Sequence, residues 1–438
     1  MTHKYRLPVS LLLLSAYFFI AFFVKRTDTA ALLASVAVVS GLYAMLIRPR
    51  SIPPEQFNYF MGLAFALRLV FLFVPTALSD DVYRFIWDGR LMEAGINPYA
   101  YLPEDLIRSR LADRESFAAL FPQINSPGYY SLYPPVLQGL FFLAVKCSFG
   151  MQALAVLNLR LLVLAAECGT FFFLGRILEL LRINRDRIFV YAFNPLVIIE
   201  LSGNVHPESV MIFFLSGALY FLLLRRTSWS AVWFALAVST KVIPLVLLPL
   251  IIRKKGLRTG IAFAALTAVI CIALFVPFAN PVLLHNLTES FCLYFHQFEF
   301  NASIYYLTKW LECRVMGQET IRYTAIVLPM LSTGIILWLS FYLKKKDDWP
   351  VVFERALAVL SAYYLFSPVV HPWYLTFPVV LSVFVPFRYA LVWSVLAFLS
   401  YAHYAVFPYR EPVLLLWTEY LIVGLGVLLE YNVSLYKK

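Results

Sequence analysis

Long uninterrupted apolar runs constrain the fold of this chain more than any other feature of its sequence. A helix needs about 20 apolar residues to cross the roughly 30 Å hydrocarbon core of a bilayer. Lipid offers no water to backbone N–H and C=O groups, so a spanning segment must be a helix or part of a closed barrel. The runs lack the alternating pattern of barrel strands. We therefore predict an all-α polytopic membrane protein with about 11 to 14 transmembrane helices.

Charged residues are rare, at 14% of the 438 residues, and they fall in short clusters between the apolar runs. The net charge of +11 would suit nucleic-acid binding, but this placement is typical of the cytoplasmic loops of membrane proteins. We therefore expect membrane lipids, and no nucleic acid, as partners. The clusters that anchor the cytoplasmic side are Arg176 to Arg187, Arg225 with Arg226, Arg253 to Arg258, and Lys344 to Lys346.

Alternation of the apolar runs between these anchors predicts a single transmembrane domain over residues 1–438. Both ends of residues 228–252 are predicted inside, so this stretch is expected to form a hairpin of two short helices with Lys241 near its outer tip. Residues 132–149 are expected to lie along the outer interface. The outer loops are then residues 79–152, which carry interfacial helices, and residues 280–320. The predicted spans are 8–24, 29–47, 58–78, 153–175, 188–202, 209–224, 259–279, 321–343, 352–367, 373–387, 389–407 and 412–430.

The six histidines are distributed unevenly across this predicted topology. Four lie in outer loops, one lies near an outer helix end, and His3 alone is cytoplasmic. This distribution favours a polar site that faces away from the cytoplasm. The outer histidines are His206, His285, His296, His371 and His403.

Two adjacent carboxylates, Asp80 and Asp81, follow the third predicted span directly. Because like charges repel and lose hydration at a membrane surface, at least one should have a raised proton affinity, which suits a general base. The alternative is that Ser79 or Asp80 caps a helix over residues 82–94. In that case Asp81 and Asp88 would favour the positive N-terminal end of the helix dipole. A cap explains one acid but not the whole cluster with Arg84, Trp87 and Arg90. Trp87 and Asp88 are candidates to bind substrate.

Four motifs follow one another along the chain in an order that resembles the C-type glycosyltransferases. They are the acidic pair after an outward span, Tyr133-Pro134-Pro135, residues 239–249 with Ser-Thr-Lys-Val-Ile-Pro and Leu-Leu-Pro, and Ser-Pro-Val-Val-His-Pro-Trp-Tyr at 367–374. The stretch SDDVYRFIWDGRLMEAGINPYAY at 79–101 is most similar to bacterial mannosyltransferases that use polyprenyl phosphate mannose. The resemblance extends from about Leu67 to Leu375.

The resemblance implies a hexosyltransferase that moves a hexose, expected to be mannose, from a polyprenyl phosphate donor to a glycolipid or glycan acceptor. It implies reaction on the non-cytoplasmic face of the bacterial inner membrane, inversion at the anomeric carbon, and an aspartate base in the first outer loop. No cofactor is required by this chemistry. Some members of the superfamily hold a metal with acidic outer residues, so a divalent metal is not excluded. The five cysteines form no CxxC pair and predict no metal site.

A lipid-linked donor needs cations at headgroup depth to hold its phosphate. Lys241 is an isolated charge within an apolar run, which favours a functional role, although a snorkelling lysine is the alternative. Asn204, His206 and Glu208 match a family loop that reads GNxHxD or GNxHxE, and the resemblance puts them near the reaction centre; the alternative is a plain turn. Further phosphate candidates are Arg84, Arg90, Arg160 and His371, and further substrate-binding candidates are Trp87, Asp88, Tyr133, His296 and Trp373.

Charged residues within other apolar runs are also compatible with a second function, which is transport. Arg68, Arg160 and Glu167 could mark the substrate path of a transporter or flippase for a lipid-linked or glycan substrate. A transporter of that kind is expected to show repeat symmetry, and this sequence has no internal repeat. Since an unpaired charge at such depth is costly, Arg68 is also predicted either to pair with Glu167 or to contact phosphate.

Overall fold

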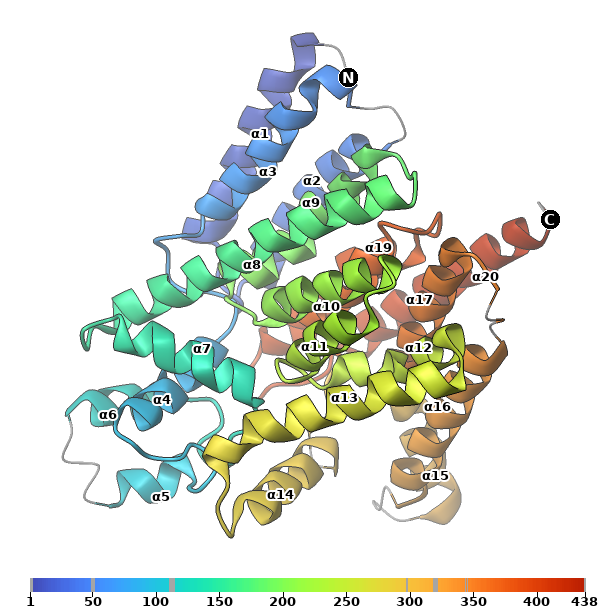
Figure 1. Cartoon of the computed structure of the whole chain (residues 1–438). Coiled ribbons are helices and arrows are strands. Elements are labelled where there is room, and N and C mark those ends of the chain that lie inside the picture. The colour runs from blue at the N-terminus through green and yellow to red at the C-terminus, as the bar shows by residue number, and fades with distance from the viewer. Residues whose placement is uncertain are drawn as a thin grey trace.

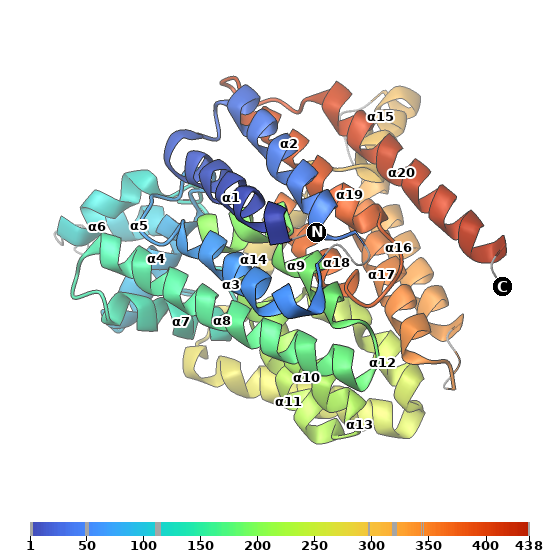
Figure 2. The ribbon, with the colours of Figure 1, turned by 90° about the horizontal axis from the view of Figure 1, so that it is seen from above.

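The structure of the chain is a computed structural model that describes residues 3–48, 52–109, 115–296, 298–317, 322–342, 344 and 346–436. Among these residues there is no β-strand, and the parallel bridge between Phe300 and Val369 is isolated. The predicted all-α fold is confirmed. Figures 1 and 2 show the helices from two directions at right angles to each other.

The first half contains ten α-helices within the described residues. They are α1 (His3–Phe23), α2 (Thr29–Leu46), α3 (Phe57–Leu69), α4 (Asp81–Glu93), α5 (Pro103–Ile107), α6 (Glu115–Leu120), α7 (Pro135–Lys146), α8 (Gln152–Leu180), α9 (Phe189–Ala192) and α10 (Glu208–Leu223). Four shorter turns of helix accompany them: η1 (Pro54–Gln56), η3 (Phe121–Gln123), η4 (Arg185–Ile188) and the π-helix η5 (Val197–Gly203).

The second half contains ten further α-helices within the described residues. They are α11 (Thr227–Val238), α12 (Leu248–Lys255), α13 (Leu257–Phe275), α14 (Leu283–His296), α15 (Ile304–Met316), α16 (Arg322–Tyr342), α17 (Trp349–Leu365), α18 (Thr376–Leu381), α19 (Tyr389–Leu396) and α20 (Val413–Tyr436). The 3₁₀ segments here are η6 (Ile243–Leu247), η7 (Val276–Phe278), η8 (Pro372–Leu375) and η9 (Ala397–Tyr404).

Within the described residues, 6 helices are long and apolar enough to cross a membrane, or up to 7 if η5 and α10, bent by 113°, form one span. The protein is therefore a polytopic membrane protein. The count is below the number of predicted spans because several apolar runs fold as shorter or broken helices. The six are Arg6–Phe23, Thr29–Leu46, Gln152–Leu180, Leu257–Phe278, Tyr323–Tyr342 and Val413–Glu430.

The predicted span 58–78 is one of the broken runs. Helix α3 ends at Leu69, and the chain continues without regular helix toward α4. Backbone carbonyls freed by such a break need donors when they are buried. Arg160 of α8 supplies them, because its guanidinium donates to the carbonyls of Leu72 and Val74 and, at 3.0 Å, to that of Gly203.

The predicted span 188–202 is broken at Asn194-Pro195, where proline removes a backbone donor and ends α9. The Asn194 side chain stabilises the chain at this break through hydrogen bonds. Its Oδ1 accepts hydrogen bonds from the backbone N–H groups of Leu196 and Val197, and its Nδ2 donates to Ser394 Oγ at 2.9 Å. The chain then continues as η5, which is buried throughout.

The predicted hairpin over 228–252 is confirmed. Helices α11 and α12 are its two short arms, and Lys241 lies between α11 and η6. The predicted interfacial helix in 132–149 corresponds to α7, which is too short to cross a bilayer at 12 residues.

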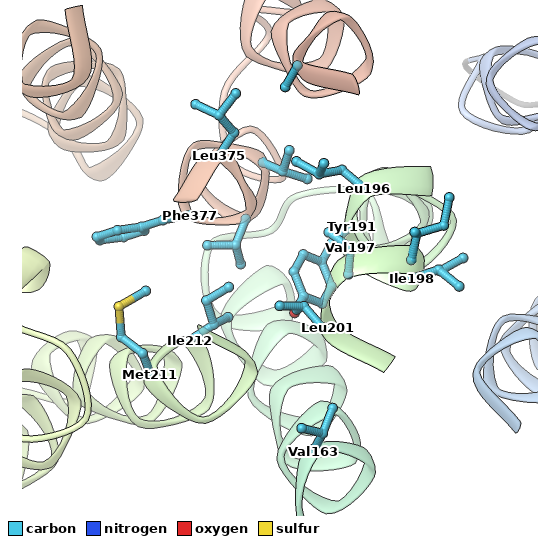
Figure 3. Close-up of a cluster of buried hydrophobic side chains, with 14 of the residues drawn as sticks. Val163, Tyr191, Leu196, Val197, Ile198, Leu201, Met211, Ile212, Leu375 and Phe377 are labelled. Carbon is cyan, nitrogen blue, oxygen red and sulfur yellow. The ribbon is translucent and has the colours of Figure 1, made fainter. Parts of the chain in front are cut away.

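The centre of the molecule is built around η5 and the start of α10. Figure 3 shows Val197, Leu201 and Ile212 in one apolar cluster with Leu375 and Phe377. These five side chains are almost fully buried. Because η5 and η8 are held by this packing, the polar residues that border them are positioned by a rigid base.

A buried ion pair lies beside this core. Arg68 Nη2 is 2.8 Å from Glu167 Oε2, and both side chains have no exposed surface. Tyr191 donates to the other carboxylate oxygen, and Arg68 also donates to the carbonyl of Ala192 at 2.9 Å. The predicted pairing of Arg68 with Glu167 is therefore confirmed.

The two large loops of the prediction lie toward one end of the molecule. In Figure 1, helices α4 to α7 and α14 occupy the end opposite to the N-terminus of α1. Helix α4 packs closely on α7, since a Cβ at Gly89 would lie 2.5 Å from the carbonyl oxygen of Phe141. This close approach holds α4 in place. The acidic pair, Asp80 and Asp81, lies at the start of that helix.

Candidate active site

Asp80 precedes α4 at the N-cap position, but its side chain makes no capping hydrogen bond. It forms an ion pair with Arg26, from the link between α1 and α2. Asp80 is still 32% exposed in this pair. A capping role therefore does not account for its carboxylate, whose charge is balanced by a guanidinium.

Asp81 is the more enclosed of the two acids, with its side chain 24% exposed. Its Oδ1 accepts a hydrogen bond from Asn125 Nδ2 at 2.7 Å. Its Oδ2 lies 3.9 Å from Nδ1 of His206, which is itself buried. On the opposite edge of the imidazole, Nε2 lies 3.4 Å from Glu200 Oε2. The three side chains form a line from the surface of the site into the core.

The loop between η5 and α10 holds His206 in this line. Val205 adopts a φ of 63°, a left-handed conformation that is unfavourable for a β-branched residue. The backbone N–H of His206 donates to the carbonyl of Glu200 at 3.2 Å, and Asn204 Nδ2 donates to Glu200 Oε2 at 2.9 Å. Strain of this kind persists where surrounding contacts enforce it, and it is typical of functional sites.

Lys241 reaches the same region from the α11–α12 hairpin. Its ammonium forms an ion pair with Glu208 and lies 4.1 Å from the ring centroid of Tyr374. Glu208 is buried, whereas the Lys241 side chain is 24% exposed. The lysine therefore presents a cation at the surface of the site while its partner remains inside.

An aromatic stack joins the two histidines of the site. Trp373 lies between them, with its ring centroid 3.8 Å from that of His206 and 4.3 Å from that of His371. Burial lowers the pKa of His371 well below its ordinary value, and the charge of Lys241 lowers it further, followed by those of His206 and His403. His371 is therefore a neutral imidazole at neutral pH.

Tyr404 of η9 completes the arrangement. The guanidinium of Arg26 lies 5.1 Å from its ring centroid. Phe300 connects Tyr404 to His371, with centroid separations of 6.1 Å and 4.8 Å. The members of this ring of contacts, which we call the site ring, are Asp80, Asp81, His206, Trp373, His371, Phe300, Tyr404 and Arg26.

The structure thus brings together Asp80, Asp81, Asn204, His206, Glu208, Lys241, His371 and Trp373 from the predicted site residues.

Three further residues of the site were not predicted from the sequence: Arg26, Asn125 and Tyr404. Arg26 did carry a signal. The predicted topology puts it on the outer side, against the positive-inside rule, and a cation there needs a reason.

Two other predicted residues bind each other within the first loop. Arg84 Nε donates to Asp88 Oδ1 at 2.9 Å, and its Nη1 donates to the carbonyls of Ser126 and Tyr129. The second Asp88 oxygen accepts a hydrogen bond from Gln138 Nε2 at 3.0 Å. Both side chains are buried. They hold residues 126–138 against α4, and their predicted contacts with substrate stay untested.

The remaining predicted residues also serve local packing. Trp87 is fully buried against Phe117, and Arg90 donates to the carbonyl of Ser116. The ring of Tyr133 packs on that of Phe85, and its carbonyl accepts a hydrogen bond from Tyr99. Arg160 binds the carbonyls described above. The side chain of His296 lies outside the described residues.

In the part of the chain that the structure describes, no group of three or more His, Cys, Asp or Glu side chains is arranged to hold a metal ion. The acids of the site are instead engaged with Arg26, Asn125, Lys241 and Tyr401, the last of which donates to Glu200 at 2.6 Å. The charge balance of the site thus comes from its own cations and hydrogen-bond donors.

A family model described as "Alpha-(1->6)-mannopyranosyltransferase, N-terminal domain" matches residues 12–254, more than half of the chain. The matched segment contains Asp80, Asp81, His206 and Lys241. His371 and Tyr404 come from the part of the chain that follows it. The comparisons with curated proteins and with solved structures gave no significant match.

Proposed function

We propose that this chain, which belongs to the alpha-(1->6)-mannopyranosyltransferase family, transfers mannose from a polyprenyl phosphate donor to a glycolipid or glycan acceptor. Membership of the family supports mannosyl transfer, and the apolar helices make the protein a membrane protein. The proposal extends these findings to the donor, the acceptor and the mechanism. The observation that carries it is the position of Asp81, a carboxylate that faces buried His206 beside the cation of Lys241.

The donor assignment rests on charge and depth. The isoprenoid tail of a polyprenyl phosphate stays in lipid, so its phosphate lies at the headgroup level and needs a cation there. Lys241 suits this role because it lies between two short apolar helices and keeps part of its side chain exposed. His371 is neutral, so the N–H of its imidazole can donate a hydrogen bond to a phosphate oxygen without a further charge.

The base assignment favours Asp81 over Asp80. Asp80 forms an ion pair with Arg26, so its carboxylate is already engaged by a guanidinium. Asp81 accepts a hydrogen bond from neutral Asn125 and faces an imidazole that can share the proton it receives. We therefore assign proton abstraction to Asp81, and positioning of the site ring to Asp80 and Arg26.

The proposed reaction is a single displacement that leads to inversion. Asp81 takes the proton of an acceptor hydroxyl while the hydroxyl oxygen forms a bond to the anomeric carbon of the mannose. The bond between that carbon and the phosphate oxygen breaks, and its electron pair stays on the polyprenyl phosphate. Lys241 and His371 would stabilise the charge that develops there. Inversion to an α-linked product would require a β-linked donor.

The cellular setting follows from the predicted topology. Positive-inside counting puts the loop of Asp81 on the non-cytoplasmic side of the bacterial inner membrane. A donor whose sugar is carried by a lipid suits that side, because soluble sugar nucleotides are made in the cytoplasm. The family match favours a transferase over a transporter or a flippase.

The decisive experiment is a transfer assay with the purified full-length protein in lipid nanodiscs. Radiolabelled polyprenyl phosphate mannose would be the donor and octyl α-mannopyranoside the acceptor. We expect a labelled disaccharide product linked α-(1→6). The donor assignment is wrong if the protein transfers mannose from a sugar nucleotide but not from the lipid-linked donor.

A further inference from the structure

A second polar cluster borders the site ring at His371 and Phe300, and none of its members takes part in the proposed proton transfer or phosphate binding. We call it the Asn301 cluster, defined as Asn301, His403 and Glu411. The backbone N–H of Asn301 donates to Glu411 Oε1 at 3.0 Å, and His403 Nδ1 lies 3.7 Å from the same oxygen. The cluster therefore joins the loop after α14 to the segment between η9 and α20.

Each member of the Asn301 cluster has a buried polar atom without a hydrogen-bond partner among the described residues. These atoms are Asn301 Oδ1, His403 Nδ1 and Glu411 Oε2. Asn301 is only 1% exposed. Buried polar atoms are nearly always hydrogen-bonded in folded proteins. Three of them in one cluster point to a ligand that carries several hydroxyl groups.

Aromatic rings form a wall beside these polar atoms. Tyr409 packs on Tyr404 and His403, with centroid separations of 5.2 Å and 5.6 Å. Phe300 closes the buried end, 5.3 Å from His403. Exposure increases along the wall from Phe300, at 2%, to Tyr409, at 44%. An aromatic wall beside a few fixed polar atoms is the composition expected of a site for a pyranose ring, which has apolar C–H faces and polar edges.

The wall leads to the proposed base. Tyr404 contacts both Tyr409 and Arg26, and Arg26 pairs with Asp80. The charges of Asp81 and Asp80 both act on the Tyr404 hydroxyl. A sugar held on Tyr404 and Tyr409 would thus present one of its hydroxyls toward the acidic pair.

The charges of the cluster select against the donor. The Glu411 side chain is largely buried and has no lysine or arginine partner among the described residues, whereas Glu299 is paired with Lys309 at 2.7 Å. The carboxylate of Glu411 would repel a phosphate, whereas Lys241 lies at the other side of His371, beside Tyr374 and Glu208. The two regions therefore suit two different substrates.

We propose that the Asn301 cluster, together with Tyr404 and Tyr409, binds the terminal sugar of the acceptor, an uncharged hexopyranoside. This inference rests on the proposed function and names the acceptor subsite of the same reaction. Asn301, His403 and Glu411 take the sugar hydroxyls as hydrogen-bond partners. Tyr404 and Tyr409 lie against its apolar face and orient the reacting hydroxyl toward Asp81.

The test measures the KM of the acceptor and the KM of the donor separately. Initial rates would be measured with octyl α-mannopyranoside as the varied acceptor, and then with the polyprenyl phosphate mannose varied. Tyr409→Ala should raise the acceptor KM about two- to tenfold, and Glu411→Ala about ten- to a hundredfold. The donor KM should stay unchanged in both. Tyr409→Phe keeps the ring and should keep the acceptor KM.

The matched control is Tyr101→Ala, which removes another tyrosine with half of its side chain exposed, in the first loop. It should change neither constant. The inference is wrong if the donor KM rises in the cluster variants or if the acceptor KM stays at the wild-type value in both alanine variants. Equal effects of Tyr101→Ala and Tyr409→Ala would also overturn it.

A binding measurement tests the proposed acceptor subsite without requiring catalysis. Saturation-transfer NMR would detect octyl α-mannopyranoside bound to the full-length protein in nanodiscs without donor. At one fixed mannoside concentration, wild type and Tyr409→Phe should give stronger signals for the sugar protons than Tyr409→Ala. Equal sugar signals in all three proteins would refute the subsite. A wild-type protein that binds the mannoside but transfers no mannose would instead refute the proposed function.

Discussion

The carboxylate of Asp81, at the start of α4, faces the imidazole of His206 in the loop between η5 and α10, with Oδ2 and Nδ1 3.9 Å apart. This distance exceeds that of a hydrogen bond but permits a strong charge interaction if the imidazole receives a proton. The arrangement suits a base that must gain a proton and pass part of its charge to a neighbour.

Asp81→Asn should lower kcat about 10²- to 10⁴-fold, since the amide cannot accept the proton of the acceptor hydroxyl. The donor KM should change little because Lys241 and His371 remain. Initial rates at saturating donor and acceptor measure the effect. Asp80→Asn is the matched control and should retain substantially more activity. The assignment is wrong if Asp80→Asn is inactive and Asp81→Asn retains wild-type kcat.

Lys241→Met should raise the donor KM at least about tenfold, because a charge-assisted contact with phosphate is lost. It also leaves Glu208 buried without its cation, which should destabilise the fold by about 3–5 kcal/mol. Adding Glu208→Gln should recover most of the thermal stability but not the donor KM. Recovery of both would show that Lys241 acts only on stability.

Arg68→Met should destabilise the protein by about 3–5 kcal/mol, because Glu167 would remain charged and buried. The double variant Arg68→Met, Glu167→Gln should regain most of this loss in a denaturation experiment in detergent. Arg176→Met removes the arginine of an exposed pair with Glu179 and should change stability by less than about 1 kcal/mol. Equal losses in Arg68→Met and Arg176→Met would contradict the structural role of the buried pair.

Gly89→Ala should cost about 1–3 kcal/mol and reduce activity, because the backbone carbonyl of Phe141 leaves no room for a Cβ on α4. Gly139→Ala, in the facing helix α7, is the control. Nothing lies within 4 Å of a Cβ built there, so it should stabilise the protein by about 0.5–1 kcal/mol. Thermal denaturation of both variants would show opposite signs.

Acidification should destabilise the protein partly through His371. Its pKa in the folded protein lies well below the ordinary value of 6.5, so the unfolded state binds the proton more readily. The stability that follows from neutral His371 is present above pH 6.5 and is lost as the pH falls from 6.5 toward the lowered pKa. The melting temperature of His371→Gln should therefore fall less between pH 7 and pH 5. Identical slopes would refute this.

The sequence alone was sufficient to predict the features that follow directly from its hydropathy pattern. The all-α membrane fold, the 228–252 hairpin and the Arg68–Glu167 pair are confirmed because apolar runs and costly intramembrane charges permit few alternatives. It also singled out Asp80, Asp81 and His206, which the structure brings together. Their roles in catalysis stay predictions.

The roles that the structure gives to Arg84 and Arg160 could not be read from the sequence. Both donate to backbone carbonyls in irregular segments, and a sequence does not show which carbonyls an unwound stretch leaves unpaired. At the breaks after Leu69 and before Pro195, the stabilising partners, Arg160 and Ser394, lie far away in the chain. Arg26 was missed because its partner, Asp80, lies beyond two helices.

The isolated bridge between Phe300 and Val369 ties the loop after α14 to the segment that carries His371. The backbone N–H of Phe300 donates to the carbonyl of Pro368, and that of Val370 donates to the carbonyl of Phe300. An acceptor that shifts Phe300 on entry would carry His371 with it. Saturation with one substrate should then change the KM of the other in steady-state kinetics.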